Sequence, residues 1–282
     1  MKRAIFIFLV LFIYTGIASA QQILTFSGIK GEYIVDSNSD ISLKAAFVKA
    51  VNEAKMEALR KAGVTENVSS SDIMTSSESG AGFKEEMNSF VSVEINGAVL
   101  NDSIVEKKSF TNQFGNLVAQ VLINVDVIKY EARADASFDF KVEGVKEYYE
   151  NGDLMNFTFL PYSGGYLKIF NVNDSESFVV FPFSSTEYPF LNDTIDRKFK
   201  PNTLINFPVN KMMGDPATKQ VGYALSTEAA REHNYLILVY TKQNIPFKGN
   251  LNYKSVLNWI YRITPDQRKV QFFDFVIVNK KV

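Results

Sequence analysis

Cysteine is absent from this 282-residue chain, and histidine and tryptophan each occur only once, as His233 and Trp259. Without cysteine the chain can form no disulfide, no thiolate metal site and no cysteine nucleophile. A single histidine also leaves zinc and most other transition-metal sites short of ligands. A stable fold therefore has to depend on an apolar core, which a chain of this length can supply.

Catalytic motifs are also missing. The only histidine has no nucleophile motif of the G-x-S-x-G kind beside it. Ser226–His233 has a helical pattern, which predicts that His233 is a cation near a helix C-terminus. Adjacent carboxylates such as Glu85 and Glu86 point to different faces of a helix, so they do not converge as an acid–base pair. We predict no catalytic residue, no metal site and no cofactor; carboxylates of raised pKa in a cleft would instead indicate an enzyme.

Long apolar runs are missing after residue 20, but the first twenty residues contain one. Lys2 and Arg3 precede the apolar stretch Ala4–Ile17, and Ala18-Ser19-Ala20 follows it as an A-x-A cleavage signature. This pattern is typical of a secretory signal peptide, and it is too short for a membrane span. We expect an exported protein that begins at Gln21, has no further membrane span, and is located in the periplasm, at the cell surface or outside the cell.

The charge balance gives no sign of a nucleic-acid partner. Loss of Lys2 and Arg3 with the signal peptide would leave 28 basic against 31 acidic side chains, a net charge of −3. Nucleic-acid surfaces are usually basic. The short basic clusters at 107–108, 197–200 and 280–281 are typical of solvated faces. We therefore expect no nucleic-acid binding.

Proline is absent from the first 160 residues, and all eight prolines lie between Pro161 and Pro265. Phenylalanine is also enriched late in the chain, with 15 of 24 at or after Phe138. This change in composition predicts two domains that meet near residues 132–136, in the segment EARADAS. The predicted division is a signal peptide at 1–20, an α+β domain at 21–133 and a β-rich domain at 136–282.

The first domain is predicted to be an alanine-rich helix packed on an antiparallel sheet. The segment SLKAAFVKAVNEAKMEALRKAG has small and apolar residues at helical spacing. Ser39 or Asp40 is the expected N-cap, and Gly63 is the expected left-handed residue after the helix. Alternating apolar residues predict strands at Ile23–Val35, at Val91–Ile95 before a bulge at Gly97, and at Leu117–Val127.

The second domain is predicted to be β-rich and sandwich-like, with one or two short helices. The stretch GGYLKIFNVNDSESFVVFP, which begins at Gly164, places two apolar runs around a polar turn and predicts a hairpin. Tyr235–Tyr240 is apolar at every position, which predicts a central strand buried on both faces. Asn252–Arg262 has a helical pattern, and Val270–Val278 is expected to be a closing strand. The fold class of the whole chain is therefore predicted to be α+β.

Tyrosines form the candidate ligand surface of the second domain. Aromatic rings can stack on sugars. The tyrosines considered for such a platform are Tyr148, Tyr149, Tyr162, Tyr166, Tyr188 and Tyr223, of which Tyr149, Tyr162, Tyr166 and Tyr188 are the predicted ligand residues. Tyrosine is also a favoured residue of half-buried strands, which explains the same side chains without a ligand. Glycan binding is therefore an alternative hypothesis.

Two further features of the sequence leave alternatives open, a calcium-loop-like turn and two candidate glycosylation sites. Asp36–Asp40 matches the first five positions of an EF-hand calcium loop. Phe47, however, stands where the closing glutamate is needed. A turn followed by a helix cap explains the same residues without calcium. Asp102-Ser103-Ile104 and Asp193-Thr194-Ile195 resemble an O-glycosylation pattern of exported bacterial proteins, which makes Ser103 and Thr194 candidate sites.

Three motifs in the second half resemble a bacterial domain family of unknown function, with the pattern Y-x-x-G-D…GYLYIF…VxxLFPN. They are Tyr149-x-x-Gly152-Asp153, Gly165-Tyr166-Leu167-x-Ile169-Phe170 and Phe178-Val179-Val180-Phe181-Pro182. The family is often appended to caspase-like, kinase or envelope proteins, and the match covers about residues 136–250. Phe183 departs from the pattern, because asparagine is usual there. The resemblance implies a compact β-rich module without catalytic residues.

The first half resembles the N-terminal module of flagellar assembly protein T and a related family of small surface lipoproteins. The shared features are the alanine-rich helix that ends in Ala58-Leu59-Arg60-Lys61-Ala62-Gly63-Val64 and the strands around Gly97 and at Leu117–Val127. This resemblance implies a role in envelope assembly. We expect an exported, non-catalytic interaction module whose partner is another envelope protein, and a glycan or cell-wall ligand is the alternative partner.

Overall fold

The computed structural model describes residues 21–36, 41–64, 97–173, 175–184, 198–211, 213–215 and 220–280. Within these ranges the chain is rich in strands and contains two α-helices, so the predicted α+β class is confirmed. Several predicted features lie outside the described residues: the signal peptide at 1–20, most of the Asp36–Asp40 turn, the Val91–Ile95 strand, Tyr188 and Thr194.

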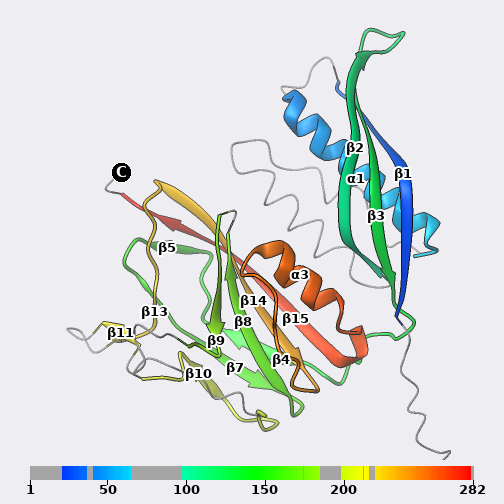
Figure 1. Ribbon diagram of the computed structural model, residues 1–282. Coiled ribbons are helices and arrows are strands. Elements are labelled where there is room, and N and C mark those ends of the chain that lie inside the picture. Colours follow the sequence, from blue (N-terminus) through cyan, green and yellow to red (C-terminus); the bar gives the residue numbers. More distant parts are fainter. Residues whose placement is uncertain are drawn as a thin grey trace, which may run out of the picture.

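Three antiparallel strands and one helix make up the described part of the N-terminal unit, residues 21–130. The strands are β1 (Gln22–Ile34), β2 (Gly97–Thr111) and β3 (Leu117–Lys129), and β3 lies between the other two. The helix α1 (Leu43–Lys61) lies against one face of this sheet, mainly over β1 and β3 (Figure 1). The buried side chains that β3 directs toward α1 are Ala119, Val121, Ile123, Val125 and Val127.

Alanine allows α1 to lie close to the sheet. Ala46, Ala50, Ala54 and Ala58 recur every four residues and are completely buried. Gly31 in β1 lies beneath them: a Cβ atom at Gly31 would overlap the carbonyl oxygen of Ala50 and lie 2.8 Å from the Cβ of Ala54. Small residues on both elements are therefore what permits this backbone approach.

The ends of α1 were predicted with mixed success. Gly63 has φ +70° and follows the C-cap Ala62, as expected for a left-handed residue after a helix. The predicted N-cap, Ser39 or Asp40, is wrong. Ser42 is the N-cap, and its hydroxyl accepts a hydrogen bond from the backbone N–H of Ala45 at 3.2 Å. The helix starts later because Ser42 is still extended and supplies the acceptor itself.

Gly97 is not a bulge, in contrast to the prediction. It is the first residue of β2, and a Cβ atom there would lie 2.6 Å from a methyl group of Val64. Glycine is therefore required for close packing at this position. The register shifts of β2 occur later, between Val99 and Asn101 and between Ile104 and Glu106.

Two main sheets and one helix make up most of the described part of the C-terminal unit, residues 131–280. The larger sheet has the order β5-β15-β14-β8-β9, in which only β15 and β5 pair in parallel. Its strands are β5 (Tyr148–Glu150), β8 (Tyr166–Val172), β9 (Ser177–Phe181), β14 (Arg231–Thr241) and β15 (Arg268–Val278). The smaller sheet contains β4 (Phe140–Glu143), β7 (Phe157–Pro161) and β10 (Ile205–Phe207). The remaining elements are the short pairs β6 (Leu154–Met155) with β13 (Tyr223–Ala224) and β11 (Gly214–Asp215) with β12 (Gln220–Val221), the helix α3 (Tyr253–Tyr261) and a 3₁₀ turn at Pro265–Gln267.

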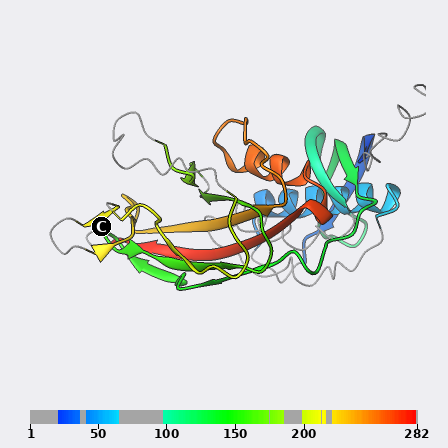
Figure 2. The same cartoon turned by 90° about the horizontal axis from the view of Figure 1, so that it is seen from below.

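β14 is buried on both faces, which confirms the prediction of a central strand at Tyr235–Tyr240. Leu236, Leu238 and Tyr240 join the aromatic core shared with the smaller sheet. Tyr235, Ile237 and Val239 contact the apolar side of α3. Figure 2 shows α3 (orange) on one side of β14 (gold) and β15 (red).

The predicted hairpin, the predicted helix at Asn252–Arg262 and the closing strand are confirmed. The helical prediction for Ser226–His233 is wrong. β14 begins at Arg231 and pairs with β15 over its whole length, so that His233 lies in a strand opposite Val276. Local helical propensity is a weak signal, and the long strand pairing overrides it here.

An ion pair fixes the segment in which the domain boundary is predicted. The Lys242 ammonium lies 2.6 Å from a carboxylate oxygen of Asp135, and the backbone and hydroxyl of Ser137 donate to the other oxygen. The Lys242 ammonium, together with the donors of Ser137, holds the pKa of Asp135 well below its ordinary value. The segment is thus connected to the strand-rich unit by charge as well as by the chain.

We expect Ala54→Leu to lower the free energy of unfolding by about 2 kcal/mol, because a larger side chain cannot fit between α1 and Gly31 without moving the helix. Urea denaturation measures this difference. Glu53→Leu is the matched control, because Glu53 is exposed on the same turn of α1, and its effect should stay within about 0.5 kcal/mol. Equal effects of the two changes would contradict the close packing.

We expect the stability difference between the wild type and Asp135→Asn to depend on pH. Because the folded-state pKa of Asp135 is lowered, its ion pair stabilises the fold above about pH 4 and this contribution is lost as the pH falls further. Urea denaturation at a series of pH values checks this. Glu131→Gln, which removes a charge from the same segment but leaves this ion pair, is the control. A difference that grows on acidification would refute the assignment.

Candidate functional site

The two units meet where the C-terminal end of α3 packs against β2 and β3. The buried apolar cluster at this junction consists of Ala98, Leu100, Ile128, Tyr130 and Tyr261. The hydroxyl of Tyr130 also donates a hydrogen bond of 2.9 Å to the carbonyl oxygen of Tyr261. The junction therefore combines apolar burial with a directional bond between the units.

Arg268 completes the junction from β15. Its side chain is buried, and its guanidinium lies 5.4 Å from the centre of the Tyr130 ring. The same guanidinium donates to the carbonyl oxygen of Ile260 at 2.5 Å and to that of Ile263. Ile260 lies in the last turn of α3, where its carbonyl also accepts the backbone N–H of Ile263, and Ile263 follows the C-cap Arg262. Arg268 thus adds hydrogen bonds at the C-terminal end of α3 and also contacts the N-terminal unit.

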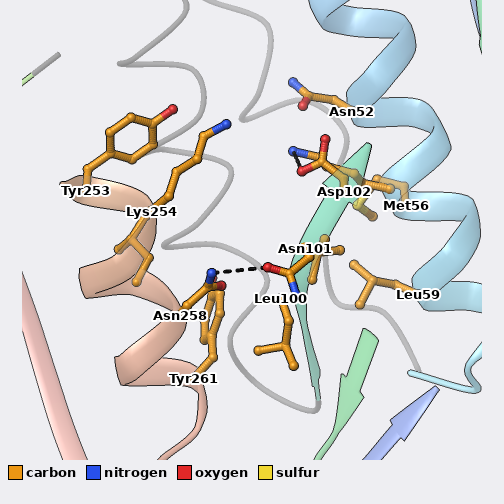
Figure 3. A pocket seen from close by; sticks show the side chains of 13 residues that line it. Asn52, Met56, Leu59, Leu100, Asn101, Asp102, Tyr253, Lys254, Asn258 and Tyr261 are labelled. Atoms are coloured by element: carbon orange, nitrogen blue, oxygen red, sulfur yellow. Dashed lines mark hydrogen bonds and ion pairs between the residues drawn. The ribbon is translucent and has the colours of Figure 1, made fainter. Parts of the chain in front are cut away.

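A cavity of about 220 Å³ lies beside this junction, between α1, β2 and α3 (Figure 3). Its lining comes from both units: Asn52, Lys55, Met56 and Leu59 of α1, Val99, Leu100, Asn101 and Asp102 of β2, and Tyr253, Lys254, Leu257, Asn258 and Tyr261 of α3. In Figure 3 the apolar Leu59 and Leu100 lie at one end of the cavity, and Asn52 and Lys254 lie at the other.

One ion pair and two amide contacts hold polar groups in the cavity wall. The ammonium of Lys55 lies 3.0 Å from a carboxylate oxygen of Asp102, and both side chains are about one-fifth exposed. The amide of Asn258 donates to the side-chain oxygen of Asn101 at 3.4 Å, which links α3 to β2. Asn101 in turn donates to Asp126 at 3.3 Å.

Two donors on the cavity wall have no acceptor among the described residues. The amide nitrogen of Asn52 is buried and makes no hydrogen bond there. The ammonium of Lys254 makes no ion pair with a described residue, and it lies 5.8 Å from the centre of the Tyr253 ring. One of these groups is a buried amide and the other belongs to an exposed lysine, and both are hydrogen-bond donors.

Sequence reasoning did not find this cavity. Its walls come from three segments that are about 50 and about 150 residues apart, and no local motif joins them. A signal is present within α1, however. Asn52, Lys55, Met56 and Leu59 have the spacing i, i+3, i+4 and i+7, which defines a second face of the helix beside the alanine stripe.

The far end of the N-terminal sheet exposes apolar side chains. Ile34, Val118 and Phe110 form one row across β1, β3 and β2, and Ile34 and Phe110 are 55% and 42% exposed. Phe114, in the turn between β2 and β3, is 77% exposed. We refer to Ile34, Phe110 and Phe114 as the hairpin tip. In Figure 1 this end of β2 and β3 extends beyond α1 and away from the C-terminal unit.

The turn that carries Phe114 is well defined. The side-chain oxygen of Asn112 accepts hydrogen bonds from the backbone N–H groups of Phe114 and Asn116, at 2.9 and 3.0 Å. Gly115 supplies the positive φ of +82° that the turn requires. Phe114 is therefore exposed on a fixed turn, where its ring cannot reach the core.

The structure does not bring the four predicted tyrosines together. Tyr149 is buried, its hydroxyl accepts a hydrogen bond of 2.9 Å from the backbone of Lys146, and burial raises the pKa of Tyr149. Tyr162 is half exposed and Tyr166 is partly buried, whereas Tyr188 lies outside the described residues.

Strand register separates Tyr149 from Tyr166. Tyr149 pairs with Ile277, which pairs with Glu232, whereas Tyr166 pairs with Thr241. Glu232 and Thr241 are nine residues apart on β14, which is about 30 Å at strand spacing. These two rings therefore lie at opposite ends of the larger sheet.

Glu232 is the centre of a polar cluster inside the C-terminal unit. Its carboxylate accepts hydrogen bonds from the amide of Asn234 at 2.8 Å, the amide of Asn173 at 3.2 Å and the hydroxyl of Thr227 at 2.9 Å. Asn171 donates to Asn234 at 3.0 Å. A carboxylate with this many internal donors is satisfied within the fold, so this cluster serves to join strand ends.

His233 lies on the edge of a shallow groove beside Tyr148, Arg231 and Asp274. The described residues that line this groove include no serine, threonine or cysteine, so they do not complete a hydroxyl or thiol nucleophile pair with His233. Elsewhere in the described ranges, no three histidine, aspartate or glutamate side chains come close enough to hold a metal ion. None of the described helices is long and apolar enough to cross a membrane.

Comparison with known proteins adds no relative from which a function could be transferred. The chain matches no protein-family model, and no curated protein sequence matches it either.

Proposed function

We propose that this chain is an exported, non-catalytic protein that docks on another envelope protein through its hairpin tip. The observation that carries the proposal is the fixed, exposed position of Phe114 at the end of the sheet that also exposes Ile34 and Phe110. Contiguous apolar surface is costly to expose to water and often marks an interaction site. Aromatic residues in particular are enriched at protein–protein interfaces.

Fold and sequence support this division of roles. In this proposal the helix-covered N-terminal sheet is the docking element, and the sandwich-like second domain at 136–282 is a frame. The resemblance of the first half to an envelope assembly module agrees with this arrangement. The signal-like sequence of residues 1–20 supports export to the periplasm or the cell surface.

The alternative, a glycan or cell-wall ligand bound by tyrosines of the second domain, has less support. A stacking platform needs exposed rings that lie close together. Tyr149 is buried, and Tyr166 lies at the other end of the sheet from it. Tyr162 alone does not form a platform, so protein docking is the better explanation.

A photo-reactive amino acid placed at residue 114 tests the proposal in intact cells. We expect one protein to be cross-linked repeatedly from this position. The matched control is the same probe at residue 251, because Leu251 is also an exposed apolar residue but belongs to the C-terminal unit. No cross-link from residue 114, or the same products from both positions, would contradict docking through the hairpin tip.

The partner identified in this way is then purified for a binding measurement. We expect Phe110→Ser with Phe114→Ser to weaken its binding about tenfold or more, because aromatic side chains at the centre of an interface contribute most of the affinity. Unchanged thermal unfolding of the double variant shows that the loss is not due to misfolding. Unchanged affinity would refute the assignment of the tip.

A further inference from the structure

We infer that the cavity between α1, β2 and α3 is a binding site for a small carboxylate-bearing ligand. This site is separate from the hairpin tip and does not depend on the docking proposal. Its lining residues come from both units, so the site exists only where the junction holds α3 beside the N-terminal sheet.

Charge favours an anion in this cavity. Among the described lining residues, Lys55 and Lys254 are opposed by a single carboxylate, that of Asp102, so this part of the lining carries a net positive charge. Asp102 lies 3.0 Å from Lys55, which leaves the Lys254 charge without a described counter-ion. A bound anion would supply it.

Hydrogen bonding favours a group that only accepts. The buried amide nitrogen of Asn52 has no acceptor among the described residues. In Figure 3 the side chain of Asn52 points from α1 toward α3, and the ammonium of Lys254 points from α3 toward α1. An ionised carboxylate has two acceptor oxygens and no donor, so it can satisfy both nitrogens at once. A charge-assisted bond to Lys254 would be the stronger of the two.

The apolar part of the lining selects among carboxylates. Met56, Leu59, Val99 and Leu257 contribute hydrocarbon surface to the same cavity. Its volume of about 220 Å³ is below the range of roughly 300–1,000 Å³ that is usual for drug-sized ligands. The site therefore suits a short acid with an apolar body, either a free organic acid or the C-terminal carboxylate of a peptide.

Titration of the ¹⁵N-labelled protein with butyrate and benzoate tests the site. We expect both acids to shift the side-chain amide signals of Asn52 and Asn258 and the backbone signal of Lys254. Butyramide and benzamide have nearly the same shape but no charge, and we expect them to bind at least about fivefold more weakly. Equal binding of acid and amide, or no shift at millimolar concentrations, would overturn the inference.

Variants separate the site from non-specific attraction. We expect Lys254→Gln and Asn52→Leu each to weaken benzoate binding about fivefold or more, whereas Lys248→Gln, at an exposed lysine outside the cavity, should leave it unchanged. Unchanged chemical shifts far from the cavity show that each variant is folded. Benzoate affinity that is insensitive to Lys254→Gln would refute the role of this lysine and with it the site.

A second arm distinguishes the two sources of the carboxylate. A short apolar peptide is titrated with a free and with an amidated C-terminus. Preferential binding of the free terminus, more tightly than benzoate, supports a peptide ligand. Binding of benzoate without binding of either peptide supports a free organic acid. Equal binding of both peptides through the same residues contradicts carboxylate recognition.

Discussion

The contact of Arg268 with Tyr130 is the constraint on which the relation between the two units depends. A buried guanidinium is costly unless its donors are paired, and here the carbonyls of Ile260 and Ile263 accept from it. The guanidinium also lies against the Tyr130 ring, whose hydroxyl donates to Tyr261. The end of α3, the start of β15 and the end of the N-terminal sheet are thereby joined at one point, which places α3 opposite α1.

The close packing of α1 supplies the other half of this arrangement. Alanines such as Ala50 and Ala54 bring the helix axis close to β1, which turns the neighbouring face with Asn52 and Lys55 toward α3. The part of the cavity lined by described residues is thus a consequence of two packing contacts. The hairpin tip lies at the other end of the same sheet, so docking and ligand binding would use separate ends of the N-terminal unit.

Sequence patterns predicted the elements that bury one or both faces, because burial requires apolar residues at regular spacing or in a continuous run. β3 and β14 were found in this way, whereas β2 was missed beyond Gly97. From Asn101 to Thr111 β2 is exposed at every position, so its residues do not alternate between apolar and polar. The strand containing His233 was taken for a helix because its pairing partner, β15, is distant in sequence. The cavity could not be predicted for the same reason: its walls meet only through the tertiary packing at the junction.

We expect the junction to hold the two units in one fixed arrangement. Because the chain has no cysteine, spin labels can be placed at Glu53→Cys and Lys248→Cys without competing thiols. These exposed positions belong to different units. Pulsed electron–electron double resonance then measures the distribution of distances between the two spin labels. We expect a single narrow distribution, which broadens when Arg268→Gln breaks the junction. A broad or double distribution in the chain with Arg268 intact would contradict a fixed arrangement of the two units.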